Sequence, residues 1–218
     1  MPAESVARTL VCSLLCIEIT DYSVPSTAAQ LFQKQQLNTA LSGALAGIAA
    51  GDRIVLEFLG ETVVVFLGHP EEAVLSAFLV RGALAEPTKT DWPKPSVRFG
   101  INLGPIRLIR DINGQLNVIG DGLVVARTIT KFAKVGQILV SRSFHDAGMP
   151  AFERFAGLFD YQGIRIDEDH REHEVYAAPF RGSDSIRPII ESGLALRREG
   201  KGARWPEAAS AWLRKFFR

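Results

Sequence analysis

The pattern of hydrophobic positions divides the first part of the chain into a strand, a long helix and a hairpin. Residues 9–19 form an almost uninterrupted run of apolar and β-branched side chains, which is typical of a central strand. In residues 26–52, apolar side chains recur every three or four positions between a Ser-Thr start and a Gly-Asp end, which predicts a helix. Residues 53–58 and 62–67 are strand-like, and Leu59-Gly60-Glu61 between them predicts a tight turn.

The rest of the chain continues this alternation. The same criteria predict, in chain order, a helix at 70–84, strands at 97–103 and 106–111, a helix at 120–133, and strands at 137–141, 161–166 and 173–177. Gly104 and Pro105 predict a turn between the first two of these strands, and residues 114–117 predict a loop. This order is typical of an α+β fold in which helices flank a mostly antiparallel sheet.

Composition narrows the class of protein. The chain has 218 residues, 47% hydrophobic and 22% charged, which suits one globular domain with a short extension. A formal net charge of +1 creates no field that would attract nucleic acid or an anionic membrane surface, so we expect neither as a partner. Residues 10–19 lack the flanks of a signal peptide. Cys12 and Cys16, four apart in a strand, cannot bond to each other, which favours a reducing, cytoplasmic compartment.

One glycine-rich segment carries a family resemblance. Gly120-Asp121-Gly122-Leu123-Val124-Val125-Ala126-Arg127-Thr128 resembles the strand-to-helix signature of class III nucleotide cyclases, bacterial branch, which reads Gly-Asp-Gly-(Ile/Val)-Asn-Val-Ala-x-Arg. Further matching segments follow the family order at residues 97–105, 111–117, 136–141 and 171–176. The resemblance covers roughly residues 9–179. It implies the ferredoxin-like class III cyclase fold, with sites formed at a dimer interface, and hence a homodimer.

The resemblance implies two metal-binding carboxylates, both altered here. In the family, an Asp on the first strand and an Asp on the following hairpin hold two Mg²⁺ ions. The first corresponds to Glu18, and the second to Gly60 or, after a one-residue slip, to Glu61. Glu places its carboxylate ~1.5 Å further from the backbone than Asp, and Mg²⁺ demands near-ideal octahedral geometry. Solvated glutamates at a strand end and in a turn are the alternative interpretation. No cofactor is expected beyond Mg²⁺ or Mn²⁺ accompanying a bound nucleotide.

The remaining family positions concern the nucleotide. Glu57 and Asn117 match the base-reading positions, where a Glu would favour guanine because it accepts hydrogen bonds from N1–H and the 2-amine. The family's ribose-binding Asn and phosphate-binding Arg are replaced by Val124 and Thr128. Arg127 is adjacent, but one residue along a helix is a turn of ~100°, so we expect it to point elsewhere. Loss of a transition-state donor typically costs ~3–4 kcal/mol of barrier stabilisation.

Two segments follow the predicted cyclase domain at residues 1–180. Residues 181–203 are largely polar and predict a flexible linker. Residues 204–218 place apolar side chains, four of them aromatic, on one face of an amphipathic helix with basic residues alongside. This helix would pack on its own domain or on a dimer mate. Docking into a protein partner is the alternative, and a membrane surface is the least favoured.

These residues predict a degenerate class III cyclase homology domain that is catalytically inactive. It would act as a dimerising regulatory or protein-interaction module and could retain nucleotide binding. The alternative is an active purine nucleotide cyclase that converts ATP or GTP to a 3′,5′-cyclic nucleotide and pyrophosphate. Such an enzyme would need a relocated cation to replace the arginine that is missing at Thr128.

Overall fold

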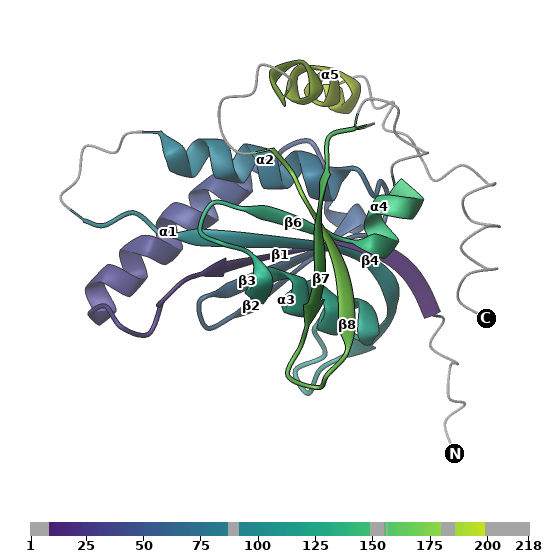
Figure 1. Cartoon of the computed structure of the whole chain (residues 1–218). Coiled ribbons are helices and arrows are strands. Elements are labelled where there is room, and N and C mark those ends of the chain that lie inside the picture. Colours follow the sequence, from purple (N-terminus) through teal and green to yellow (C-terminus); the bar gives the residue numbers. More distant parts are fainter. Residues whose placement is uncertain (1–8, 87–91, 149–154, 156, 180–185, 199–218) are drawn as a thin grey trace.

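The protein is built around one mixed β-sheet (Figure 1). The structure is a computed structural model that describes residues 9–86, 92–148, 155, 157–179 and 186–198. The strands are β1 (Thr9–Ile19), β2 (Arg53–Phe58), β3 (Glu61–Phe66), β4 (Val97–Arg110), β5 (Leu116–Ile119), β6 (Ile138–Ser141), β7 (Asp160–Ile166) and β8 (Glu172–Ala177). Their order is β2-β3-β1-β4-β6-β8-β7, and β5 pairs with the far end of β4. All neighbours are antiparallel except β4 and β6. The predicted α+β class with a mostly antiparallel sheet is confirmed.

Helices cover both faces of this sheet. They are α1 (Thr27–Ala44), α2 (Glu72–Ala85), α3 (Asp121–Phe132), α4 (Arg142–Gly148) and α5 (Ile186–Arg198), with a short 3₁₀ turn at Ala50–Asp52. Figure 1 shows α1 and α2 on one side of the sheet and α3 on the other. Among the described residues, no helix has the length and apolar character that crossing a membrane requires.

Alternation along β1 explains the two layers. Leu15 and Ile17 pack into the large core beneath α1 and α2, whereas Leu14 and Cys16 pack into a second cluster that includes Ala126 of α3. Successive strand residues point to opposite faces, so a strand that is buried on both faces is apolar at nearly every position; Ser13 is the buried polar residue of β1. This is why the pattern at residues 9–19 is unbroken. Both cysteines are free and buried, as the strand spacing predicts.

The predicted turn at Gly104-Pro105 is wrong, because β4 runs through it without interruption. Pro105 pairs with Val11 of β1 on one side. On the other side it lies between the β6 pairing at Phe99–Ile101 and the β5 pairing at Arg107–Arg110. The strand is therefore locally an edge there, where a residue without an N–H is tolerated. The loop predicted at 114–117 is also wrong in part, since β5 begins at Leu116.

The flexible linker predicted at residues 181–203 is wrong for the part that forms α5. This helix packs on α2: a side-chain carbon added at Gly193 would lie 2.8 Å from Leu75. Ile189 and Ile190 pack against the large core. The outer face of α2 is apolar, so it needs such a cover. The terminal helix predicted at residues 204–218 lies outside the described residues and stays a prediction.

Candidate functional site

Glu18 and Glu61 lie side by side at one end of the sheet. They are direct cross-strand partners, Glu18 near the end of β1 and Glu61 at the start of β3. Both point toward the α3 side, because they continue the alternation of Cys16 and Val63, which pack there. Of the two positions that the sequence left open, Glu61 is therefore the one opposite Glu18. Gly60 instead makes the turn with a φ of +71°, where a Cβ would lie 2.7 Å from Cβ of Tyr22.

Each glutamate is bound by an arginine of the same chain. Arg98 of β4 forms a bidentate ion pair with Glu18, with Nη2 to Oε1 at 2.7 Å and Nε to Oε2 at 3.2 Å. Nε of Arg127, on α3, lies 2.6 Å from Oε1 of Glu61. The Arg127 guanidinium also lies over the ring of Phe58, 5.1 Å from its centroid. Arg127 is therefore held by Glu61 and Phe58, and the expectation that it points away from the phosphate position stays a prediction.

The carboxylates at the family's metal positions are not free for the pair of metal ions that a cyclase uses. Magnesium needs several oxygen ligands in octahedral geometry. Within the part of the chain that the structure describes, no group of three or more His, Cys, Asp or Glu side chains could hold a metal ion. The two available carboxylates, Glu18 and Glu61, already bind guanidinium groups. Their role as metal ligands therefore lacks support from the geometry.

Val124 and Thr128 face a cavity of about 360 Å³ between α3 and the β7–β8 hairpin. Two cations, Lys131 and Arg171, line it together with three carboxylates from residues 167–169. Arg171 is engaged within the hairpin, with Nε 3.0 Å from Oδ2 of Asp167 and Nη2 2.9 Å from Oδ2 of Asp169. The charged groups therefore sum to a negative value, which repels a triphosphate.

The hairpin turn is organised around Asp167. Its Oδ2 lies 2.9 Å from Nε2 of His173, and its Oδ1 accepts hydrogen bonds from the backbone N–H groups of Asp169 and Arg171. The hydrogen bond with His173 and then those with Arg171 lower the pKa of Asp167 to about 2. The hydrogen bonds of Asp167 thus close the turn between β7 and β8.

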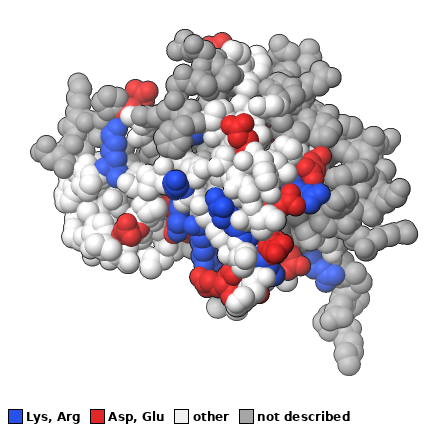
Figure 2. All heavy atoms as spheres, in the orientation of Figure 1, with Lys and Arg blue, Asp and Glu red and all other residues white. Residues whose placement is uncertain are grey.

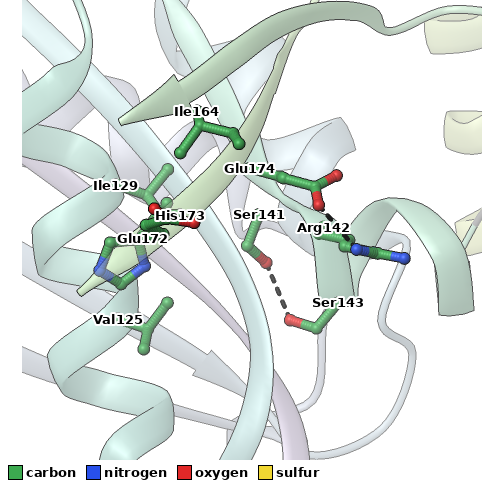
Figure 3. Close-up of a pocket in the computed structure, with 9 residues that line it drawn as sticks. All are labelled: Val125, Ile129, Ser141, Arg142, Ser143, Ile164, Glu172, His173 and Glu174. Carbon is green, nitrogen blue, oxygen red and sulfur yellow. Dashed lines mark hydrogen bonds and ion pairs between the residues drawn. The ribbon is translucent and has the colours of Figure 1, made fainter. Parts of the chain in front are cut away.

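A second cavity of about 300 Å³ lies beside the first, between α3, the start of α4 and β8 (Figure 3). Its serine hydroxyls belong to a buried network centred on Asn102. Ser141 and Ser143 donate to Oδ1 of Asn102 at 2.7 Å and 3.0 Å, and Nδ2 of Asn102 donates to the carbonyl of Gly122 at 3.0 Å. The hydroxyl groups therefore hold β4, β6, α3 and α4 together.

The two predicted base-reading residues lie apart from the paired glutamates. Glu57 is the cross-strand neighbour of Thr62, and both contact Lys34 of α1, at 3.7 Å and 2.8 Å. Glu57 is therefore on the α1 side of the sheet, opposite to Glu61. Asn117 uses Oδ1 to accept a hydrogen bond from the N–H of Val118 at 2.7 Å. A role of Glu57 and Asn117 in base recognition stays a prediction.

The glycine signature itself has a packing role. Gly120 has a φ of +130°, and a Cβ there would lie 2.8 Å from the carbonyl oxygen of Pro105. A Cβ at Gly122 would lie 2.9 Å from the carbonyl carbon of Gly104. These contacts involve backbone atoms that cannot rotate away, so the start of α3 fits against β4 only if both positions are glycine.

Arg98 is the residue of the site that sequence reasoning missed. It lies in the segment 97–105 that supported the resemblance, yet only the strand register places it opposite Glu18. No local pattern announces that register, because the two residues are 80 positions apart.

The fold matches solved cyclase domains. The catalytic core of a rhodopsin-guanylyl cyclase with converted specificity, in complex with ATPαS, is 16% identical with a TM-score of 0.64, over 81% of this chain and 100% of that one. The guanylate cyclase domain of RhGC from Catenaria anguillulae, in complex with GTP, is 18% identical with a TM-score of 0.62 over the same shares. An adenylate/guanylate cyclase/hydrolase from Silicibacter pomeroyi is 20% identical with a TM-score of 0.61, over 78% and 97%.

At the level of sequence, no family model and no curated protein matches the chain. The structural likeness covers about four fifths of the chain, and it agrees with the family that the glycine signature indicated. The chain therefore has the fold of the class III adenylate and guanylate cyclase catalytic domains.

Proposed function

We propose that this chain is a catalytically silent cyclase homology domain, which acts as a dimerising regulatory or protein-interaction module in the cytoplasm. The cavity lined by Val124 and Thr128 carries the proposal. It lies at the family's ribose- and phosphate-binding positions, yet it offers an apolar side chain, a hydroxyl and an excess of carboxylates. A transition state for phosphodiester ring closure needs preorganised cations at this place. The free, buried Cys12 and Cys16 support a reducing compartment.

Exposed apolar side chains that line the two cavities support a dimer. Val124 and Ile166, which line this cavity, are 45% and 62% exposed, and Ile164, which lines the second cavity, is 48% exposed. A solvent-facing group of large aliphatic side chains is typical of an interaction surface. On the face that Figure 2 shows, acidic and basic side chains are interspersed, without the broad basic area that nucleic acid would require. A second copy of the chain is the partner we propose, with the segment 204–218 as a further candidate for protein contacts.

Product formation tests the silence of the site. We expect purified full-length protein with ATP or GTP and Mn²⁺ to form no cyclic nucleotide detectable by mass spectrometry. A variant that restores the family residues, Glu18→Asp, Glu61→Asp, Val124→Asn and Thr128→Arg together, provides the matched comparison. Cyclic product from the unmodified chain would contradict the proposal. Product from the restored variant alone would show that these positions silence an otherwise competent scaffold.

The position of Lys131 favours the alternative of a working cyclase. It lines the same cavity as Thr128, one helical turn further along α3. If product forms and Lys131→Ala abolishes it, Lys131 is the relocated cation and the chain is an enzyme. We expect neither the unmodified chain nor the Lys131→Ala variant to form cyclic product.

Two valines of similar exposure test the dimer. Val124 is 45% exposed on α3, and Val55 is 41% exposed on the edge strand β2. We expect Val124→Asp to shift the sedimentation coefficient from dimer to monomer, because a buried unpaired charge at an interface is costly. Val55→Asp should leave the dimer intact. A monomeric unmodified chain, or equal effects of both variants, would contradict the proposed interface.

A further inference from the structure

We propose that Arg98 and Arg127 neutralise the paired glutamates in place of metal ions, so that this end of the sheet is closed by a guanidinium lock. The lock consists of Glu18–Arg98 and Glu61–Arg127. It joins β1 to β4 and, through the Lys131 carbonyl and Arg127, joins β4 and β3 to α3. This inference rests on the proposed function, since a site that performs no ring closure has no need of a metal, but it concerns binding and is tested separately from turnover.

The register makes the lock necessary. Glu18 and Glu61 are direct cross-strand partners, and like charges in that position repel each other. The Glu61 side chain is only 11% exposed and that of Glu18 only 25%, so water screens the repulsion poorly. Two carboxylates in this arrangement need positive charge close by. The described structure supplies it from two different elements of the same chain.

Each guanidinium group is fixed at more than one point. Arg98 binds Glu18 through two nitrogens and donates its third, Nη1, to the carbonyl oxygen of Lys131 at 2.9 Å. Arg127 combines its ion pair with the face of Phe58. A planar group held by a bidentate carboxylate and a second contact loses little further entropy on pairing. The bidentate, three-quarters buried Glu18–Arg98 pair differs from the single, exposed contacts of ordinary surface ion pairs.

The lock and a metal ion would compete for the same oxygens. A divalent cation could reach both glutamates only after the guanidinium groups had left. The chain would then lose three hydrogen bonds of Arg98, the ion pair of Arg127 and a cation–π contact. We therefore expect the unmodified protein not to bind Mg²⁺ or Mn²⁺ at this end of the sheet. Removing both arginine charges should instead leave two adjacent carboxylates, which are the oxygen ligands that these ions prefer.

Mn²⁺ binding, measured by electron paramagnetic resonance of the free ion, tests the lock. Three proteins are compared with the unmodified chain: Arg98→Gln with Arg127→Gln, the same pair with Glu18→Gln and Glu61→Gln added, and Glu18→Gln alone. We expect the first variant to bind Mn²⁺ at least about tenfold more tightly than the unmodified chain, and the second to lose that gain. We expect Glu18→Gln alone to leave the Mn²⁺ affinity unchanged, because the unmodified chain should bind no ion at Glu18.

The outcomes separate this inference from the proposed function. Mn²⁺ binding by the unmodified chain that Glu18→Gln abolishes would overturn the lock, even if no cyclic product were ever formed. A folded Arg98→Gln and Arg127→Gln variant without a gain in Mn²⁺ affinity would also overturn it. If that variant does not fold, the comparison of the unmodified chain with Glu18→Gln still decides the question. Cyclic product without Mn²⁺ binding at Glu18 would contradict the silent site and leave the lock standing.

Discussion

The start of α3 and its exposed outer face belong to the same helix but behave differently. At the start, Gly120 and Gly122 contact backbone atoms of β4, and Asn102 holds the carbonyl of Gly122. On the outer face, the exposed Val124 and the half-buried Thr128 line a cavity. The start keeps the residues of the cyclase signature, whereas the outer face does not. Packing against a backbone permits few replacements, while an exposed side chain can change its chemistry without cost to the fold.

The largest expected effect comes from filling the contact at the start of α3. In Gly122→Val, the new side chain would meet the backbone of Gly104 and Pro105 within 3.0 Å. Backbone atoms cannot move aside cheaply, so we expect a loss of about 3 kcal/mol or more in the free energy of unfolding, measured by urea denaturation. Gly43→Ala is the control, since nothing lies within 4 Å of its Cβ in α1. It should stabilise the protein by about 0.5–1 kcal/mol. Similar effects at the two positions would contradict the comparison.

The network around Asn102 gives the next largest effect. Asn102→Ala would leave the carbonyl of Gly122 without its donor and would remove the acceptor that Ser141 and Ser143 share, although both serines keep other hydrogen-bond partners. Each such group costs roughly 1–3 kcal/mol when unsatisfied, and we expect about 2–3 kcal/mol in total because the serines can rearrange. The exposed Asn113→Ala should stay within about 0.5 kcal/mol. If Asn102→Ala were equally mild, the network would not secure the start of α3.

The same contrast explains what the sequence could predict. The unbroken apolar run at 9–19 and the glycine signature follow from burial and close backbone contact, so their patterns indicated both the elements and the fold. The continuation of β4 through Pro105 could not be predicted, because it depends on which strands lie beside that residue. Arg98 was missed for the same reason: its partner is set by strand register rather than by local spacing. The cover that α5 provides for α2 is likewise a tertiary contact.

Double-mutant cycles on two ion pairs extend the comparison to the end of the sheet where Glu18 and Arg98 lie. The Glu18 and Arg98 side chains are about one quarter exposed and form a bidentate pair. We expect a coupling energy of about 1–2 kcal/mol from thermal unfolding of Glu18→Gln, Arg98→Gln and the double variant. Arg142 and Asp146 on α4 are more exposed, at 58% and 34%, and should give about 0.3–0.5 kcal/mol. Equal coupling energies in the two cycles would mean that the Glu18–Arg98 pair is an ordinary surface contact.

The smallest expected effect is a loss of stability at acidic pH. It concerns Asp167, which lines the cavity of Val124 and Thr128 on the side of the β7–β8 hairpin. The pKa of Asp167 lies at about 2 in the folded protein, below its ordinary value of 3.8, first because of the hydrogen bond with His173. A carboxyl group whose folded pKa is depressed adds stability above its unfolded pKa, and this contribution is lost as the pH falls from about 4 to about 2. Asp167→Asn lacks that contribution at every pH.

The difference in urea midpoint between the unmodified chain and Asp167→Asn should therefore be constant near neutrality and shrink as the pH falls through that window. The neighbouring carboxylate of Asp169 is 76% exposed, so Asp169→Asn should show a difference that stays small throughout. A gap between the unmodified chain and Asp167→Asn that persists at the acid end would mean that the turn is held by the backbone hydrogen bonds of residues 167–171, which an asparagine can also accept. In that case backbone hydrogen bonds would determine the shape of the hairpin, as backbone contacts determine the start of α3. The charged side chains of residues 167–171 could then be replaced without loss of the fold, like Val124 and Thr128 on the outer face of α3.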